Sequence, residues 1–202
     1  MPASRGINLA RCSRVIKIAT TERLNLRVLQ EEDLRAFVAY RSQPDVARYQ
    51  SWEPTYSMND AEALLAAQAN VAFGTPGAWV QVAALDRVSG ELVGDCAVRV
   101  LADQPATAEV GVTLAPARQG AGLATEALGA IVSTLFEVHH MHRVFGQADD
   151  RNTAVQNLFE RLGFRCEARQ VEADWFKGEW TTLRVYAMLE REWRTARAAG
   201  LR

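Results

Sequence analysis

Hydrophobic and polar residues alternate in some stretches of this chain and recur every three or four residues in others. Strand-like runs cover residues 21–29, 78–86, 91–100, 107–115, 143–149, 164–176 and 179–189. Helical spacing predicts helices over 31–43, 57–73, 122–138 and 153–162, of which 122–138 has the strongest apolar pattern. The segment 87–90, RVSG, predicts a hairpin between two of the strands.

The resulting order is β-α-α-β-β-β-α-β-α-β-β, which predicts an α/β fold with helices on both faces of a mixed sheet. No internal repeat or long linker divides the chain. We therefore expect one domain over 18–194, a leader over 1–17 and a tail over 195–202. The leader contains basic residues and no acid, which indicates a disordered segment in preference to an RNA-binding arm.

Composition narrows the possible partners and the cellular setting. The net charge of −1 over 202 residues gives no overall field that would attract nucleic acid or an anionic membrane, so neither is expected as a partner. No apolar run is long enough to cross a bilayer. Cys12, Cys96 and Cys166 are odd in number and lack metal-ligand spacing, which favours a reducing, cytoplasmic location.

The stretch PARQGAGLATEAL, residues 116–128, places Gly120 and Gly122 between a predicted strand and a predicted helix. A helix start offers unpaired backbone N–H groups and the positive end of the helix dipole, which together bind anions such as phosphate. Glycines let the backbone approach a ligand closely. Neither a P-loop nor the dinucleotide-binding fingerprint matches this spacing. The residues alone therefore allow an anion-binding loop or a plain turn.

The pattern Gln119-x-x-Gly122-x-Ala124 after AEVGVTLAP, with DRNTAVQNLFERLGF at 150–164, resembles the GNAT family of N-acetyltransferases. The similarity is greatest to the branch that acetylates N-terminal amines of ribosomal proteins, and it extends over 21–193. It implies six to seven mostly antiparallel strands, a splayed central parallel pair, and acetyl-coenzyme A as acyl donor without a metal. The implied coenzyme-binding residues are Val112, Thr113, Leu114, Gln119, Gly120, Ala121, Gly122, Leu123, Ala124, Thr125 and Asn152.

The resemblance also implies that a primary amine attacks the acetyl thioester directly in a ternary complex, with Glu109 as general base. Taken alone, Glu109 could equally be a surface-facing strand residue. Two positions depart from the family pattern: Val155 stands where the ribosomal-protein branch often has serine, and Phe159 where many relatives have tyrosine. Neither side chain can donate a proton to the leaving thiolate.

A protein N-terminal α-amine is the first expected acceptor, because its pKa of about 8 makes deprotonation at pH 7 cost only about 1 kcal/mol. The alternatives are a small amine, such as an aminoglycoside or a polyamine, and a weakly catalytic acyl-coenzyme A binding module. Tyr49, Trp52, Tyr56 and Trp175 are candidates for the wall of an acceptor pocket, or else anchor loops as hydrophobic clusters.

Two further expectations concern metals and assembly. His139, His140 and His142 lack the i, i+4 spacing of a helical zinc site, so we expect no metal there. The exposed edge that such a sheet leaves would permit a homodimer.

Overall fold

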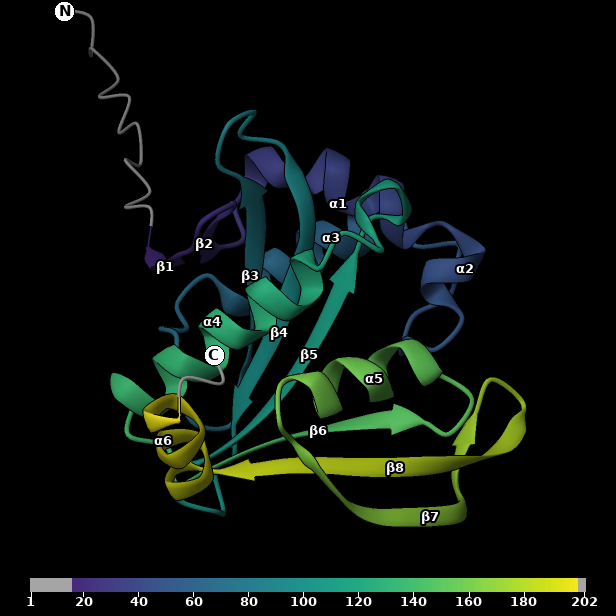
Figure 1. The fold of residues 1–202 in the computed structure, drawn as a ribbon. Coiled ribbons are helices and arrows are strands. Elements are labelled where there is room, and N and C mark those ends of the chain that lie inside the picture. Colours follow the sequence, from purple (N-terminus) through teal and green to yellow (C-terminus); the bar gives the residue numbers. More distant parts are fainter. Residues whose placement is uncertain (1–15, 200–202) are drawn as a thin grey trace, which may run out of the picture.

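Eight strands form one mixed sheet in the part of the chain that the computed structural model describes, residues 16–199 (Figure 1). Their spatial order is β1-β2-β3-β4-β5-β6-β8-β7. The strands span Lys17–Thr20 (β1), Leu24–Val28 (β2), Trp79–Asp86 (β3), Leu92–Val100 (β4), Thr107–Leu114 (β5), Arg143–Asp149 (β6), Arg165–Phe176 (β7) and Glu179–Leu189 (β8). The predicted α/β fold with a mixed, mostly antiparallel sheet is confirmed, with one strand more than expected.

The additional strand is β1, which pairs with β2 through contacts such as Lys17 opposite Arg27. It has only four residues, too few to show a clear alternation. Most of the predicted leader, residues 1–15, lies outside the described residues. Its last residue, Lys17, already belongs to the sheet.

Within the described residues, six α-helices connect or flank the strands: α1 (Leu34–Arg41), α2 (Pro44–Ala47), α3 (Met58–Gln68), α4 (Leu123–Glu137), α5 (Thr153–Arg161) and α6 (Glu190–Ala198). Helix α6 runs across the predicted boundary between domain and tail at 194. It does so because Trp193 is buried against Phe136 of α4, with ring centroids 5.5 Å apart, so α6 packs onto the domain.

The central parallel pair, β5 and β6, stays together only over a short distance. Its register pairs are Thr107 with Arg143, Ala108 with Val144 and Glu109 with Phe145. Beyond Glu109, β5 continues to Leu114 paired with β4 alone, and β6 continues to Asp149 paired with β8 alone. The two strands therefore splay, as the sequence resemblance implied.

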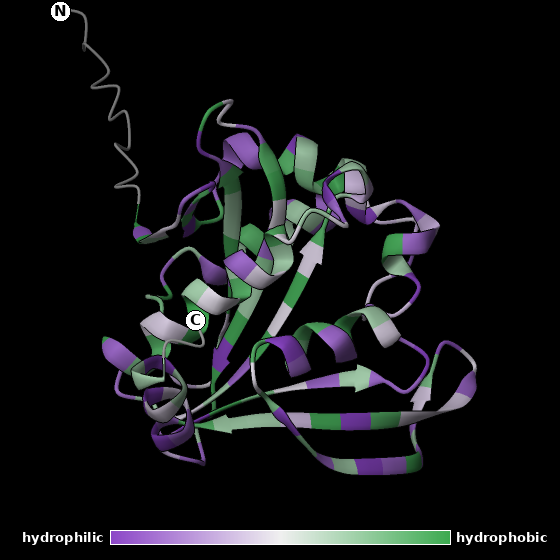
Figure 2. Ribbon diagram, in the orientation of Figure 1, coloured by the Kyte–Doolittle hydropathy of each residue, from purple (hydrophilic) through white to green (hydrophobic). Residues whose placement is uncertain are grey.

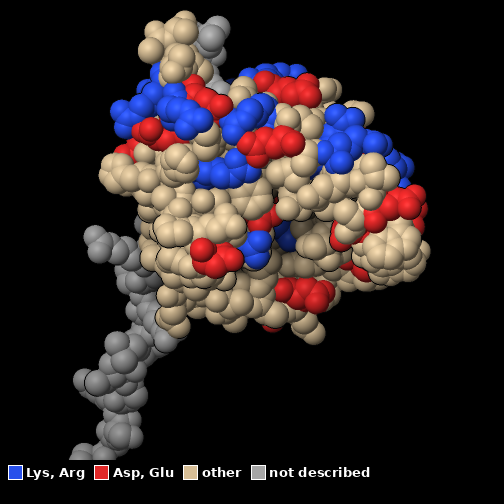
Figure 3. Space-filling view, turned by 90° about the horizontal axis from the view of Figure 1, so that it is seen from below, with Lys and Arg blue, Asp and Glu red and all other residues tan. Residues whose placement is uncertain are grey.

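Hydrophobic residues concentrate in the central strands and in α4 (Figure 2). On the face shown in Figure 3, positive and negative side chains are interspersed. Charged side chains on β6, β7 and β8 form ion pairs. Arg143 Nη2 lies 2.6 Å from Glu167 Oε2, and Asp150 pairs with both Arg169 and Arg184. Arginine side chains on these strands are thus paired with neighbouring acids.

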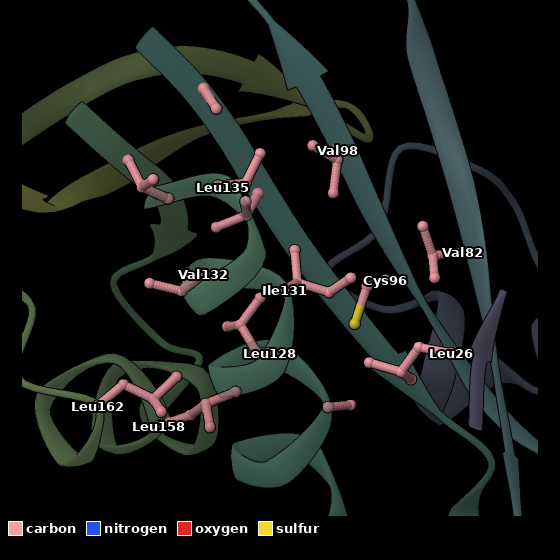
Figure 4. Close-up of a cluster of buried hydrophobic side chains, with 14 of the residues drawn as sticks. Leu26, Val82, Cys96, Val98, Leu128, Ile131, Val132, Leu135, Leu158 and Leu162 are labelled. Carbon is pink, nitrogen blue, oxygen red and sulfur yellow. The ribbon is translucent and has the colours of Figure 1, made fainter. Parts of the chain in front are cut away.

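Helix α4 forms the centre of the main core. Its buried residues recur at helical spacing, which places Leu128, Ile131 and Leu135 on the side that faces the sheet. Figure 4 shows these side chains directed toward Leu26, Val82 and Cys96 of the strands. Helix α5 joins the same core through Leu158 and Leu162. This packing fixes the start of α4 beside the end of β5.

A second, smaller core on the opposite face contains a buried ion pair. Arg41 Nη2 of α1 lies 2.9 Å from Asp95 Oδ2 of β4, and the Tyr40 hydroxyl donates to the other carboxylate oxygen. The Arg41 guanidinium also stacks 3.8 Å from the Trp52 ring centroid and 3.9 Å from that of Phe37. Helix α1 and the segment around Trp52 are thereby attached to the sheet.

We expect Asp95→Ala to lower the free energy of unfolding by roughly 3–5 kcal/mol, because it leaves the Arg41 charge buried without its partner. The matched control is Glu91→Ala, which removes the exposed partner of Arg118 and should cost less than about 1 kcal/mol. Urea denaturation of both variants measures the difference. Equal losses would show that the buried pair contributes no more than a surface pair.

Candidate active site

Two adjoining cavities lie where β5 and β6 separate. The outer cavity, of about 530 Å³, lies beside the start of α4, and the inner cavity, of about 160 Å³, lies between the splayed strands and the β7–β8 hairpin. Both are lined by the same five residues at their junction: Tyr49, Gln50, Val112, Asn152 and Val155. A ligand in the outer cavity and a second ligand in the inner cavity would therefore meet between β5 and α5.

The glycine stretch forms the rim of the outer cavity at the start of α4. Gly120 has φ +76° and Gly122, the residue that caps α4, has φ +79°. Backbone of this left-handed kind is strained for other residues, and no atom lies within 4 Å of a Cβ built on Gly120. The helix start thus faces an open space with its N–H groups and positive dipole end, as an anion site requires.

The predicted coenzyme-binding residues gather around this outer cavity. Its lining includes Val112, Thr113, Leu114, Gln119, Gly120, Gly122, Leu123, Ala124, Thr125 and Asn152. Ala121 is the one predicted residue that does not line it, since its carbonyl instead accepts a hydrogen bond from Arg23 Nη1 at 2.8 Å. Asp45, Val46, Leu158 and Arg161 also line the cavity and carried no signal in the sequence.

A network of polar contacts holds the glycine loop and the first turn of α4 in place. The Glu126 carboxylate accepts from Thr21 Oγ1 and from the backbone N–H of Arg23, and Arg23 Nε lies 2.6 Å from Glu126 Oε2. Because Arg23 also binds the Ala121 carbonyl, one side chain connects the residue before β2 with the loop and α4. The loop geometry therefore depends on residues more than ninety positions away in sequence.

Helix α5 supplies one wall of both cavities. The Asn152 side chain caps this helix by accepting from the Val155 N–H at 3.3 Å. Val155 and Phe159 line the inner cavity, and the Phe159 ring stacks on Tyr186 with centroids 5.4 Å apart. Neither of these two positions therefore provides a proton donor.

Only one of the four predicted acceptor-pocket aromatics lines a cavity. Tyr49 contributes to both cavities. Trp52 and Tyr56 pack instead into the second core beside Arg41, and Trp175 is 60% exposed, with its ring edge-on to Trp180. The pocket wall comes instead from Asp174 and from neighbouring positions that carried no signal in the sequence, namely Gln50, Phe176, Thr181 and Leu183.

Glu109, the predicted general base, lies at the last register pair before the strands part. Its carboxylate is 2.5 Å from Arg99 Nη2, and it lines a separate shallow depression. Gln147 of β6 lines both that depression and the inner cavity, so the two spaces adjoin. Asp149, which we did not single out, faces the inner cavity directly and is held by Arg151.

The structure also bears on metal binding and on membrane insertion. No group of three or more His, Cys, Asp or Glu side chains that could hold a metal ion occurs among residues 16–199. His139 packs edge-on against Phe73, with ring centroids 5.0 Å apart. Within the same described range, no helix combines the length and apolar character needed to cross a membrane.

The splayed parallel pair, and the glycine-rich turn and helix start at its opening, are the features that the sequence resemblance implied. The family model described as acetyltransferase (GNAT) domain matches residues 23–165, and the chain belongs to this family. It is 24% identical over 173 residues to the uncharacterized N-acetyltransferase p20 from Bacillus licheniformis, covering 86% of this chain and 96% of p20. The uncharacterized N-acetyltransferase YnaD from Bacillus subtilis is 27% identical over 174 residues, covering 86% and 98%.

Solved structures show the same fold. The spermidine N-acetyltransferase from Vibrio cholerae in complex with CoA and spermine matches with a TM-score of 0.75 and 21% identity, over 86% of this chain and 99% of that one. A GNAT-family acetyltransferase from Bacillus anthracis matches with a TM-score of 0.76 and 24% identity, over 87% and 99%. The protein is accordingly an N-acetyltransferase of the GNAT type.

The network around Glu126 should make the folding stability depend on pH in the acid range. Burial raises the pKa of Glu126, but the hydrogen bonds from Thr21 and Arg23 and the charge of Arg23 hold it below the ordinary 4.5. Since the folded-state pKa is lowered, the stabilisation is present above about pH 4.5 and is lost as the pH falls through the folded-state value.

We therefore expect Glu126→Gln to flatten the decline in unfolding free energy between about pH 5 and about pH 3. Urea denaturation across that range measures the slope. Glu62→Gln, a change at an exposed acid of α3, should retain the wild-type slope. An unchanged slope in Glu126→Gln would show that this network does not contribute to the pH dependence of the unfolding free energy.

Proposed function

We propose that this enzyme transfers an acetyl group from acetyl-coenzyme A to a primary amine, with the donor in the outer cavity and the acceptor in the inner one. The observation that carries the proposal is the gathering of the predicted coenzyme residues, Ala121 excepted, around the outer cavity. GNAT acetyltransferases use acetyl-coenzyme A, and the Vibrio cholerae neighbour is a complex with CoA.

The residues present fit such a donor. The open space at Gly120 and the start of α4 would receive the phosphates, while Arg161 adds a positive charge to the same wall. The splayed end of β5, from Val112 to Leu114, would offer backbone groups to an extended chain, as an open sheet edge does. The bound donor would supply an activated thioester. Neither Val155 nor Phe159 carries a transferable proton, so no side chain is assigned to protonate the leaving sulfur.

A protein N-terminal α-amine, as in the ribosomal-protein branch, is the first proposed acceptor. Such an amine loses its proton at pH 7 for about 1 kcal/mol, whereas a lysine amine requires nearly 5 kcal/mol. A site without an assigned acid is better matched to the less demanding acceptor. Glu109 remains the proposed base, because it stands where the strands part and adjoins the inner cavity through Gln147.

A small polyamine is the second candidate acceptor. The Vibrio cholerae neighbour is named as a spermidine N-acetyltransferase and contains spermine. The inner cavity of this chain is lined by two aspartates and by no Lys, Arg or His, which suits a cationic acceptor. A mass shift on either a spermidine or a peptide acceptor distinguishes the two candidates.

Gly122→Val should weaken binding of acetyl-coenzyme A, because a side chain at φ +79° strains or displaces the loop. The matched control is Gly90→Val, at φ +74° in a hairpin turn with open space around it. Both variants should lose stability of roughly 1–2 kcal/mol, and only Gly122→Val should lose affinity in a calorimetric titration. Wild-type affinity in Gly122→Val would refute the assignment of the loop.

Glu109→Gln should reduce turnover by about 10²- to 10⁴-fold, the usual effect of losing a general base. Coenzyme affinity should stay at the wild-type value, because Glu109 does not line the outer cavity. Asp103→Asn alters an exposed acid of the same depression and should leave turnover unchanged. Release of free thiol in the presence of an amine measures the rates, and normal turnover in Glu109→Gln would exclude it as the base.

A further inference from the structure

The inner cavity has an unbalanced charge. Among the described residues, its lining contains two carboxylates, those of Asp149 and Asp174, and no cationic side chain. The other walls are apolar or neutral, with Val112, Phe176 and Leu183 among them. Whether the cavity selects a cation therefore depends on how each of the two aspartates is partnered.

Asp149 is neutralised within the protein. Its carboxylate accepts from the backbone N–H of Arg151 at 2.8 Å, from Nε at 2.9 Å and from Nη2 at 2.7 Å. The side-chain hydrogen bonds from Arg151 are the main reason why the pKa of Asp149 lies below its ordinary value. Arg151 also contacts Glu179, so these groups hold the β6–α5 turn against β8. Asp149 is thus fully engaged before any ligand arrives.

Asp174 has no such partner. Its side chain is half-buried in the cavity wall, and among the described residues it makes no ion pair or hydrogen bond through its carboxylate. The nearby cation, Lys177, is directed elsewhere: its Nζ donates to the carbonyls of Ala47 at 2.8 Å and Trp52 at 2.7 Å. These bonds fasten the β7–β8 hairpin to the loop after α2 and keep the lysine from neutralising Asp174.

The dimensions of the cavity restrict what Asp174 can bind. A volume of about 160 Å³ equals the share of about five water molecules in the liquid, each occupying about 30 Å³. The space therefore admits the narrow end of an aliphatic chain, with Phe176 and Leu183 beside the methylene groups. An apolar or anionic group there would leave the carboxylate desolvated without compensation.

We propose that Asp174 is the specificity-determining residue for the acceptor, binding an ammonium group at the end of a short, unbranched aliphatic amine. The inference rests on the proposed function and on its second candidate acceptor, the polyamine, since it takes the inner cavity as the acceptor site. Asp174, on the β7–β8 hairpin, recognises the acceptor. Removal of the proton from the attacking amine is a separate step, proposed above for Glu109.

The test is calorimetric titration with 1,4-diaminobutane in the presence of free coenzyme A, so that no turnover occurs. Asp174→Asn should bind the diamine about tenfold or more weakly than the wild type, because it loses a charge-assisted hydrogen bond. Asp174→Glu should recover part of the affinity. Glu172→Gln, which removes an exposed acid from the same strand outside the cavity, should bind like the wild type.

The outcomes separate this inference from the proposed function. Equal diamine affinity in the wild type and Asp174→Asn would overturn the role of Asp174 and leave the coenzyme assignment intact. A wild-type protein that binds no coenzyme A would overturn the proposed function itself. In steady state, a raised KM for the diamine with an unchanged kcat supports recognition by Asp174, whereas a lowered kcat with unchanged KM contradicts it.

Discussion

The parallel ladder between β5 and β6 ends after Glu109 and Phe145, and both cavities exist because of that ending. Helix α5 occupies the point of separation. A Cβ on Gly146 would come within 2.3 Å of the Phe159 ring and 2.9 Å of the Val110 carbonyl, so only glycine fits there. The Phe159 ring is therefore packed tightly where β5 and β6 begin to separate, and it forms part of the wall of the cleft.

The two ends of the cleft have opposite electrostatic character. At the outer end, where Asp45 also lines the cavity, backbone N–H groups at the start of α4 and the side chain of Arg161 favour an anion. The nearby carboxylate of Glu126 would oppose this, but Arg23 and Thr21 neutralise it and direct it away from the cavity. At the inner end, Asp174 leaves a negative charge without compensation. One cleft can thus hold an anionic donor and a cationic acceptor without competition between them.

Much of the fold could be predicted from the sequence, because the spacing of apolar residues in a long amphipathic element indicates both its type and its buried face. The pattern of 122–138 located α4, and the glycines located its start. The short elements β1 and α2 have four residues each, too few for a period to appear. Trp52 and Tyr56 line neither of the two cavities, because Arg41, a charge in an otherwise apolar helix face, lies against both rings in a core around its ion pair with Asp95.

The inner cavity wall could not be derived from alternation, because β7 changes phase along its length. Cys166 pairs with Tyr186, but Ala168 pairs with Val185, so two even-numbered residues lie on opposite faces of the strand. A second irregularity follows between Gln170 and Asp174. Because both irregularities precede Asp174, counting from the start of the strand gives no reliable face for Asp174 or Trp175. The bulges turn Asp174 inward and leave Trp175 exposed, so the charge that distinguishes this cleft depends on tertiary pairing that no local pattern encodes.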